Sequence, residues 1–210
     1  MVIQEIVMLF DLHVHQDKHS LDSKLSIIDA IQEAKTKGLD GICITDHDDL
    51  GLRPFAKYLS EYHNLLVIVG VEIYTLDGDL LCYGIDELPT ERLSAKATID
   101  FVHERGGVCI AAHPYRHNNR GVKNLIRTLE LDAIEVYNGR TDEASNERAY
   151  SEALKLGLPM TASSDAHSVG EIGGYVTDFE EAIYSEEDLI RAIKLGKMTY
   201  QRTYRDEITA

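Results

Sequence analysis

The sequence lacks several features that define whole classes of protein. No run of about 18 consecutive apolar residues occurs, so no segment is typical of a transmembrane helix. The first ten residues carry neither a basic leader nor a small-residue cleavage site, which argues against a signal peptide. We therefore expect a protein that resides in the cytoplasm and has no membrane partner.

Cysteine and basic residues are also scarce. The three cysteines, Cys43, Cys82 and Cys109, each lie in an apolar, strand-like run, and neither their number nor their spacing suggests a disulfide framework. With 21 Lys and Arg against 36 Asp and Glu, the formal net charge is -15. A general nucleic-acid-binding surface needs a basic stripe, so this balance argues against a nucleic-acid partner.

The remaining pattern is that of an α/β protein. Short β-rich runs alternate with amphipathic stretches, which predicts βα units, and 210 residues suit a single domain spanning 1–210. Asp77-Gly78 predicts a hairpin turn between two further strands. The expected helices cover 26–37, 54–62, 94–105, 122–130, 142–156 and 185–195, and the expected strands cover 6–10, 41–45, 65–71, 108–112, 133–137, 158–162, 175–177 and 198–200.

His13-Val14-His15 follows the first of these strands. In an extended strand alternate side chains point the same way, so both imidazoles emerge on one face. Two nitrogens presented together are suited to one metal ion, although the same pattern also fits two ordinary surface histidines.

Polar residues then recur at nearly every strand end. In barrels of parallel strands and surrounding helices, these ends open on one face, so residues far apart in sequence converge there. Imidazole and carboxylate ligands suit Zn, Mn or Fe better than Ca, and more than four ligands imply at least two ions. Any one of these residues is also compatible with a plain surface loop. The residues are His13, His15, His47, Glu72, His113, Asn138, Asp165 and His167.

The motifs that contain these residues resemble those of a known superfamily. They look like the successive motifs of the polymerase and histidinol phosphatase (PHP) superfamily of metal-dependent phosphoesterases, in order and over nearly the whole chain. The matching segments are Asp11-Leu12-His13-Val14-His15, Ile44-Thr45-Asp46-His47-Asp48, Gly70-Val71-Glu72, Ala112-His113-Pro114 and Ser164-Asp165-Ala166-His167.

The resemblance implies a distorted, TIM-like barrel of about seven βα units with two or three divalent ions at the carboxyl ends of its strands. Asp22 maps best to the ligand that follows the His-x-His motif, with His19 as its competitor. Asn138 stands where many members carry a histidine, and an amide is a weaker ligand than an imidazole. The implied ligands, which are also the implied catalytic residues, are His13, His15, Asp22, His47, Glu72, His113, Asp165 and His167.

The expected reaction is hydrolysis of a small phosphomonoester, such as a nucleotide, a bisphosphonucleotide or histidinol phosphate. A hydroxide shared by two metal ions would attack phosphorus. Arg116, Arg120 and Arg140 follow strand ends and would hold the phosphoryl oxygens, with His19 and His117 as candidate proton donors. The alternatives are a phosphodiesterase or 3′–5′ exonuclease, an amidohydrolase, and a metal-binding module without turnover.

Overall fold

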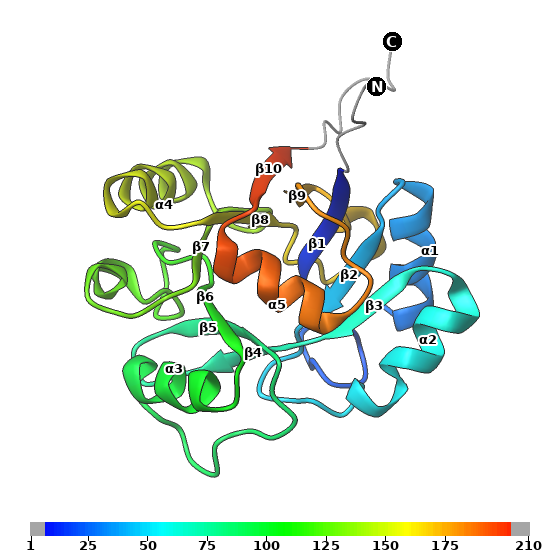
Figure 1. Cartoon of the computed structure of the whole chain (residues 1–210), viewed down its shortest axis with the longest axis horizontal. Coiled ribbons are helices and arrows are strands. Elements are labelled where there is room, and N and C mark those ends of the chain that lie inside the picture. Colours follow the sequence, from blue (N-terminus) through cyan, green and yellow to red (C-terminus); the bar gives the residue numbers. More distant parts are fainter. Residues whose placement is uncertain (1–6, 203–210) are drawn as a thin grey trace.

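Strands and helices alternate along the chain largely as the sequence predicts (Figure 1). A computed structural model describes residues 7–202, so Ile6 of the first expected strand lies outside the described part. The helices are α1 Ile27–Thr36, α2 Ala56–His63, α3 Ala95–Glu104, α4 Glu143–Leu156 and α5 Glu186–Leu195, with short 3-10 turns at Arg53–Phe55, Lys123–Arg127 and Val169–Glu171. The strands are β1 Met8–Val14, β2 Gly41–Ile44, β3 Leu66–Val69, β4 Val71–Tyr74, β5 Asp79–Tyr83, β6 Val108–Ala111, β7 Ala133–Asn138, β8 Met160–Ser163, β9 Tyr175–Phe179 and β10 Met198–Arg202.

The strands form two sheets, each with five strands, in the orders β10-β9-β1-β2-β3 and β4-β5-β6-β7-β8. Strands β1, β2 and β3 pair in parallel, as do β6, β7 and β8, whereas β9, β10 and the β4–β5 hairpin pair antiparallel. The predicted α/β class and the hairpin are confirmed. Within residues 7–202 the strands do not form one closed, hydrogen-bonded barrel.

A single residue, Gly70, separates the two sheets where β3 ends and β4 begins. A Cβ atom at this position would lie 2.5 Å from the ring of Tyr83, so only glycine allows Tyr83 to pack against the crossing. Near the same end, isolated bridges join Val14 to Ala166 and His47 to Glu72. The carboxyl ends of strands from both sheets are therefore held next to each other.

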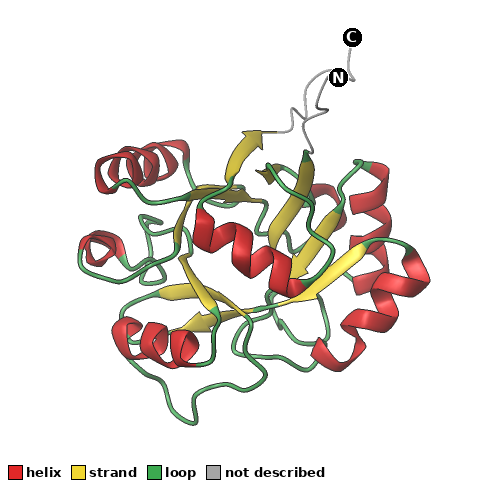
Figure 2. Ribbon diagram, in the orientation of Figure 1, coloured by secondary structure: helices red, strands yellow, loops and turns green. Residues whose placement is uncertain are grey.

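Two kinds of hydrophobic core stabilise this arrangement. Between the inner faces of the sheets, Phe10 and Tyr83 pack with Leu189 and Ile193 of α5, which lies across the space that the strands enclose (Figure 2). Helices α1 and α2 cover the outer face of the first sheet, and α3 and α4 cover that of the second. In the described range no helix combines the length and hydrophobicity needed to cross a membrane.

The helix boundaries follow from their capping residues. Ser26, Ser94 and Ser185 each accept a hydrogen bond from a backbone N–H in the first turn of the helix that follows, as does Asp142 at α4. The helix predicted at 122–130 is wrong, because only a 3-10 turn over Lys123–Arg127 is present. Lys123 has φ of 53°, a left-handed conformation that is incompatible with continuing an α-helix.

Candidate metal centre

The side chains predicted to bind metal meet at one end of the two sheets. His13 lies in β1, and His15 and His47 follow β1 and β2 of the first sheet. Glu72 lies in β4, while His113 follows β6 and Asp165 and His167 follow β8 of the second sheet. Their ligand atoms form three overlapping groups: His13 with His15 and Asp165, His13 with Glu72 and His113, and His15 with His47 and His167.

The first group is spaced like ligands of one ion. The Nε2 atoms of His13 and His15 are 2.9 Å apart, and Oε2 of Glu72 lies 3.4 Å from the first and 3.3 Å from the second. Oδ1 of Asp165 lies 3.5 and 3.4 Å from the same two nitrogens. Ligands that share an ion at about 2.0–2.2 Å are separated by roughly 2.8–3.6 Å, so these four residues fit one coordination sphere.

Glu72 connects this group to the second. Its Oε1 lies 2.9 Å from Nε2 of His113, whereas its Oε2 faces His13 and His15. A carboxylate that presents one oxygen to each of two neighbouring groups can bridge two ions. His113 and Asp165 have φ of 29° and 54°, and this left-handed backbone turns each side chain off its strand toward the centre.

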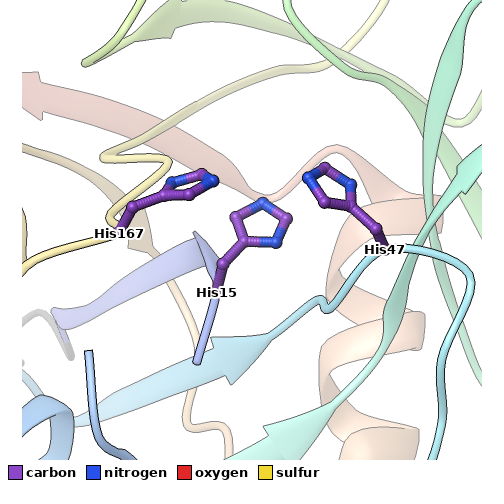
Figure 3. Close-up of side chains that lie close together, drawn as sticks. All are labelled: His15, His47 and His167. Atoms are coloured by element: carbon purple, nitrogen blue, oxygen red, sulfur yellow. The ribbon is translucent and has the colours of Figure 1, made fainter. Parts of the chain in front are cut away.

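The third group is formed by His15, His47 and His167. Figure 3 shows the ring of His15 between the other two, with centroid distances of 4.3 Å to His47 and 4.4 Å to His167. Oδ2 of Asp22 lies 3.3 Å from Nε2 of His47 and 3.2 Å from Nε2 of His167. The ring of its competitor His19 is instead 2.9 Å from Asp49, so these contacts favour Asp22 as the additional ligand.

Charge and hydrogen bonding both fit a divalent cation. Oε2 of buried Glu72 lies 2.8 Å from Nδ1 of His47, and Nδ1 of buried His113 has no hydrogen bond to any described residue. Burial alone would raise the pKa of Glu72, but the positive charge of His13 and hydrogen bonds from His113 outweigh it and hold the pKa well below its usual value. Burial would likewise raise the pKa of Asp165, but the neighbouring His13 and His15 outweigh it and hold this pKa well below its usual value. Two ionised carboxylates thus lie among buried imidazoles, which is a donor set for Zn, Mn or Fe.

Sequence comparison supports a family assignment. A model of the PHP-associated family, PHP_C, matches residues 143–198. An uncharacterised protein of Methanocaldococcus jannaschii is 32% identical over 162 residues, which cover 72% of this chain and 94% of that protein. A PolC-type DNA polymerase III of Lacticaseibacillus paracasei is 32% identical over 152 residues, covering 72% of this chain and 9% of the polymerase.

Solved structures share the fold. A two-domain protein of Bacteroides vulgatus containing a predicted PHP-like metal-dependent phosphoesterase superposes with a TM-score of 0.74 at 19% identity, covering 94% of this chain and 65% of that one. The lesion-specific endonuclease EndoQ of Pyrococcus furiosus gives 0.67 at 18% identity, covering 90% and 56%. The chain is thus similar in sequence to PHP-associated proteins over residues 143–198 and shares the fold of PHP-like structures.

The candidate metal centre includes a buried residue that the strand-end pattern missed. Glu135 lies in the middle of β7, and its Oε1 is 3.0 Å from Nδ1 of His13, while its Oε2 accepts hydrogen bonds from the backbone of His113 and the amide of Asn138. Such a carboxylate orients the imidazole and raises its basicity. The signal in the sequence is a charged residue inside an otherwise apolar strand.

Asp11 and Asp46 support the centre indirectly. Asp11 accepts hydrogen bonds from the backbones of Ser164 and Gly173, so it fixes the loops around β8 and β9 rather than an imidazole. Asp46 accepts one from the hydroxyl of Ser20, whose oxygen lies 3.2 Å from Nδ1 of His15.

The three arginines line the same pocket as five of the candidate ligands, Asp22, His47, Glu72, Asp165 and His167. This metal pocket has a volume of about 480 Å³. Arg116 donates to Asp165 and to Asn138, Arg120 lies 2.6 Å from Asp79, and Arg140 lies 3.2 Å from Glu171. The residues that line the pocket are His19, Leu21, Asp22, His47, Glu72, Arg116, Asn118, Arg120, Arg140, Asp165 and His167.

Two of the expected roles look different in this geometry. The amide oxygen of Asn138 accepts hydrogen bonds from Arg116, Thr141 and the backbone of Arg140, so it faces donors rather than the ligand groups. Of the candidate proton donors, His19 lines the metal pocket, whereas His117 is 83% exposed and lies outside it. Asp79 is a further buried acid beside the centre, and burial with the negative charge of Glu72 raises its pKa to about 9.

Proposed function

We propose that this protein is a metal-dependent phosphoesterase of the PHP superfamily that hydrolyses a small phosphomonoester at the carboxyl ends of a distorted barrel. The observation that carries the proposal is the joint lining of one pocket by candidate metal ligands and by Arg116, Arg120 and Arg140. A phosphate group needs cations on several oxygens, and a planar guanidinium can contact two of them. Two or three ions of Mn, Zn or Fe are the proposed cofactors.

The residues of the centre divide into ligands and supports. Glu72 and Asp165 hold negative charge against cations, and His13, His15, His47, His113, His167 and Asp22 complete the donor set. Divalent ions bound there would lower the pKa of a water molecule and offset charge on the phosphoryl group. Burial and the neighbouring His15 lower the pKa of His167, which favours the neutral imidazole that a ligand requires.

The arginines contribute in different ways. Arg116 is engaged with the buried carboxylate Asp165 and Arg120 with the buried acid Asp79, so both guanidinium groups are already held by acidic side chains beside the centre. Arg140 is 43% exposed and has Glu171 as its ion-pair partner. Its side chain can therefore turn toward a phosphoryl oxygen at the cost of one partly exposed ion pair, which is worth at most about 1 kcal/mol.

The strongest alternative is phosphodiester cleavage in a nucleic acid, because EndoQ shares the fold. The net charge of -15 favours a small substrate over a polyanion. An amidohydrolase and a metal-binding module without turnover are the remaining alternatives.

The decisive experiment combines metal analysis with a substrate panel. The purified protein is loaded with Mn, Zn or Fe, its metal content is measured by elemental analysis, and phosphate release is followed with phosphomonoesters, with phosphodiesters and oligonucleotides, and with amides as separate classes. The proposal expects at least two ions per chain and turnover of phosphomonoesters. Two bound ions with no phosphate released from any monoester would disprove it, and cleavage confined to one of the other classes would identify the corresponding alternative.

A further inference from the structure

A second pocket adjoins the metal pocket and carries a different chemistry. This side pocket, bounded by Tyr115, Arg116, Asn118, Lys123, Asn124 and Arg148, has a volume of about 420 Å³. Arg116 and Asn118 line both pockets, so the two cavities share a wall. The side pocket therefore lies directly beside the metal pocket, at the position of Arg116.

The side pocket is basic within a strongly acidic chain. Its lining contains cationic and amide side chains and a tyrosine, but no carboxylate. Among the lining residues, Arg116 is paired with Asp165 of the metal pocket, and His117, which also lines the side pocket, lies 3.8 Å from Asp142. Because the chain as a whole carries -15, a local excess of positive charge creates a potential that selects anions at this position.

Arg148 is oriented by uncharged neighbours. Its guanidinium carbon lies 4.1 Å above the ring of Tyr115, and its Nη2 donates to Oδ1 of Asn124 over 3.3 Å. Tyr115 is 5% exposed and donates its hydroxyl to the same Asn124 oxygen, so the ring under the guanidinium is fixed. The remaining N–H groups of Arg148 are available to an anion.

Arg148 and Lys123 differ from the arginines of the metal pocket. Arg116, Arg120 and Arg140 each lie in contact with an acidic side chain of the chain. Within residues 7–202, neither Lys123 nor Arg148 has a carboxylate in ion-pair contact, whereas nearby Arg127 is paired with Glu152. Their charge is thus not neutralised from within the described part of the chain.

We propose that the side pocket binds a second anionic group, a phosphate or a carboxylate, on the leaving-group part of the substrate. This inference rests on the proposed phosphoesterase function and narrows its substrate class to small molecules with two anionic ends. Arg148 offers a planar fork and Lys123 a point charge, which together suit either anion. A small bis-anion is favoured over a nucleic-acid strand because the chain as a whole has a net charge of -15.

The test compares matched substrates in matched variants. Metal-loaded wild type, Lys123→Ala, Arg148→Ala and the double variant are assayed with a hexose bisphosphate against a hexose monophosphate, and with phosphoglycerate against glycerol phosphate. Lys57→Ala on α2 removes the same charge from a distant, exposed position and serves as the control. Binding of the same compounds is measured by calorimetry on the same metal-loaded proteins.

We expect kcat/KM for the doubly anionic substrates to fall about 10-fold in each single variant, with the singly anionic substrates changing less than about twofold. Lys123→Arg should restore most of the preference. An unchanged preference in the double variant would overturn the inference while leaving the phosphoesterase function intact, and a loss seen only with oligonucleotides would replace the small anion by a nucleic-acid backbone.

The binding measurement separates this inference from the proposed function. If no phosphomonoester is hydrolysed, the proposed function fails. Weaker binding of the bisphosphate, but not of the monophosphate, by the double variant would still support an anion site. Equal binding of the bisphosphate by the wild type and the double variant would disprove the anion site.

Discussion

The guanidinium of Arg116 joins Asn138 to Asp165. Nη2 of Arg116 donates to Oδ1 of Asn138 over 2.8 Å and also to Oδ2 of Asp165, while Nε donates to Thr141. The other oxygen of Asp165 faces His13 and His15. Asp165 thus presents one oxygen to the candidate metal ligands and the other to a fixed cation of the chain.

Arg116→Ala is expected to lower kcat by about 10- to 100-fold, because Asp165 loses a charge-assisted hydrogen bond that sets its orientation. The bound metal should change little, since the oxygen that faces the imidazoles remains. Arg116→Lys should recover less than half of the loss in activation free energy, as an ammonium cannot reproduce the planar fork. Steady-state kinetics and elemental analysis provide the measurements, with the surface variant Arg127→Ala as control. A full loss of metal would assign Arg116 to holding the centre together.

Glu72→Gln keeps the shape of a buried side chain but removes the charge between two ligand groups. We expect the loss of at least one bound ion and a decrease in turnover of more than about 100-fold, beyond the effect of a residue that only orients a ligand. Asp165→Asn should behave similarly, and asparagine also tolerates the left-handed backbone of this position. His63→Ala, at the end of α2, should leave activity nearly unchanged. Equal losses in all three variants would refute these ligand assignments.

Glu135→Gln tests the residue behind His13. The amide preserves the size of the side chain, but it holds the Nδ1 proton of the imidazole less strongly than a carboxylate does. We expect metal affinity, measured by competition with a chelator, to fall about 10- to 100-fold. Full occupancy should return at high metal concentration together with most of the activity. Unaltered affinity would show that Glu135 serves only to hold the backbone of His113.

Proton competition gives the centre a defined pH dependence. Burial alone would lower the pKa of His13, but Asp165, Glu135 and Glu72 outweigh it and raise the pKa well above its usual value. A raised folded-state pKa stabilises the metal-free protein fully below about pH 6.5, and this contribution is lost as the pH rises through the folded pKa. Glu72 and Asp165 have lowered pKa values, so they change the stability of the protein only below about pH 4.3. They do not contribute to its pH dependence above about pH 6.5.

A metal ion requires the neutral imidazole, so its affinity changes in the opposite direction. Above about pH 6.5 the Tm of the chelated protein should decrease, and the increase in Tm on adding Mn or Zn should grow. Differential scanning calorimetry at several pH values measures both quantities. Calorimetric titration in two buffers of different ionisation enthalpy should show proton release on metal binding. A metal-induced shift in Tm that is constant with pH would contradict this expectation.

The sequence predicts which side chains converge at the candidate metal centre better than it predicts the shape of the scaffold. His13, His47, Glu72, His113 and Asp165 were found because strand boundaries are visible in the hydrophobic pattern and a polar residue at such a boundary stands out. The pairing of strands depends on contacts between distant segments, so the split into two sheets at Gly70 could not be derived from local pattern. The backbone of Lys123 is left-handed, which prevents the predicted helix from forming, and this conformation also depends on its tertiary surroundings.

Residues behind the ligands were harder to predict. Glu135 lies within an apolar strand, and its importance appears only when His13 is placed opposite it. Asp22 was preferred to His19 from the motif, and the contacts with His47 and His167 support that preference. The side pocket was not anticipated at all, because Tyr115, Lys123 and Arg148 have no common spacing in the sequence.

Each of the three ligand groups draws side chains from both sheets: His15 and His47 with His167, His13 with Glu72 and His113, and His13 and His15 with Asp165. An ion bound by any of them is therefore a cross-link between the two halves of the molecule. We expect the chelated protein to open between the sheets under limited proteolysis, and the metal-loaded protein to resist cleavage there. If ions are held there, metal binding and the rigidity of the scaffold depend on the same few bonds, and a variant that weakens a ligand is expected to loosen the contact between the sheets as well.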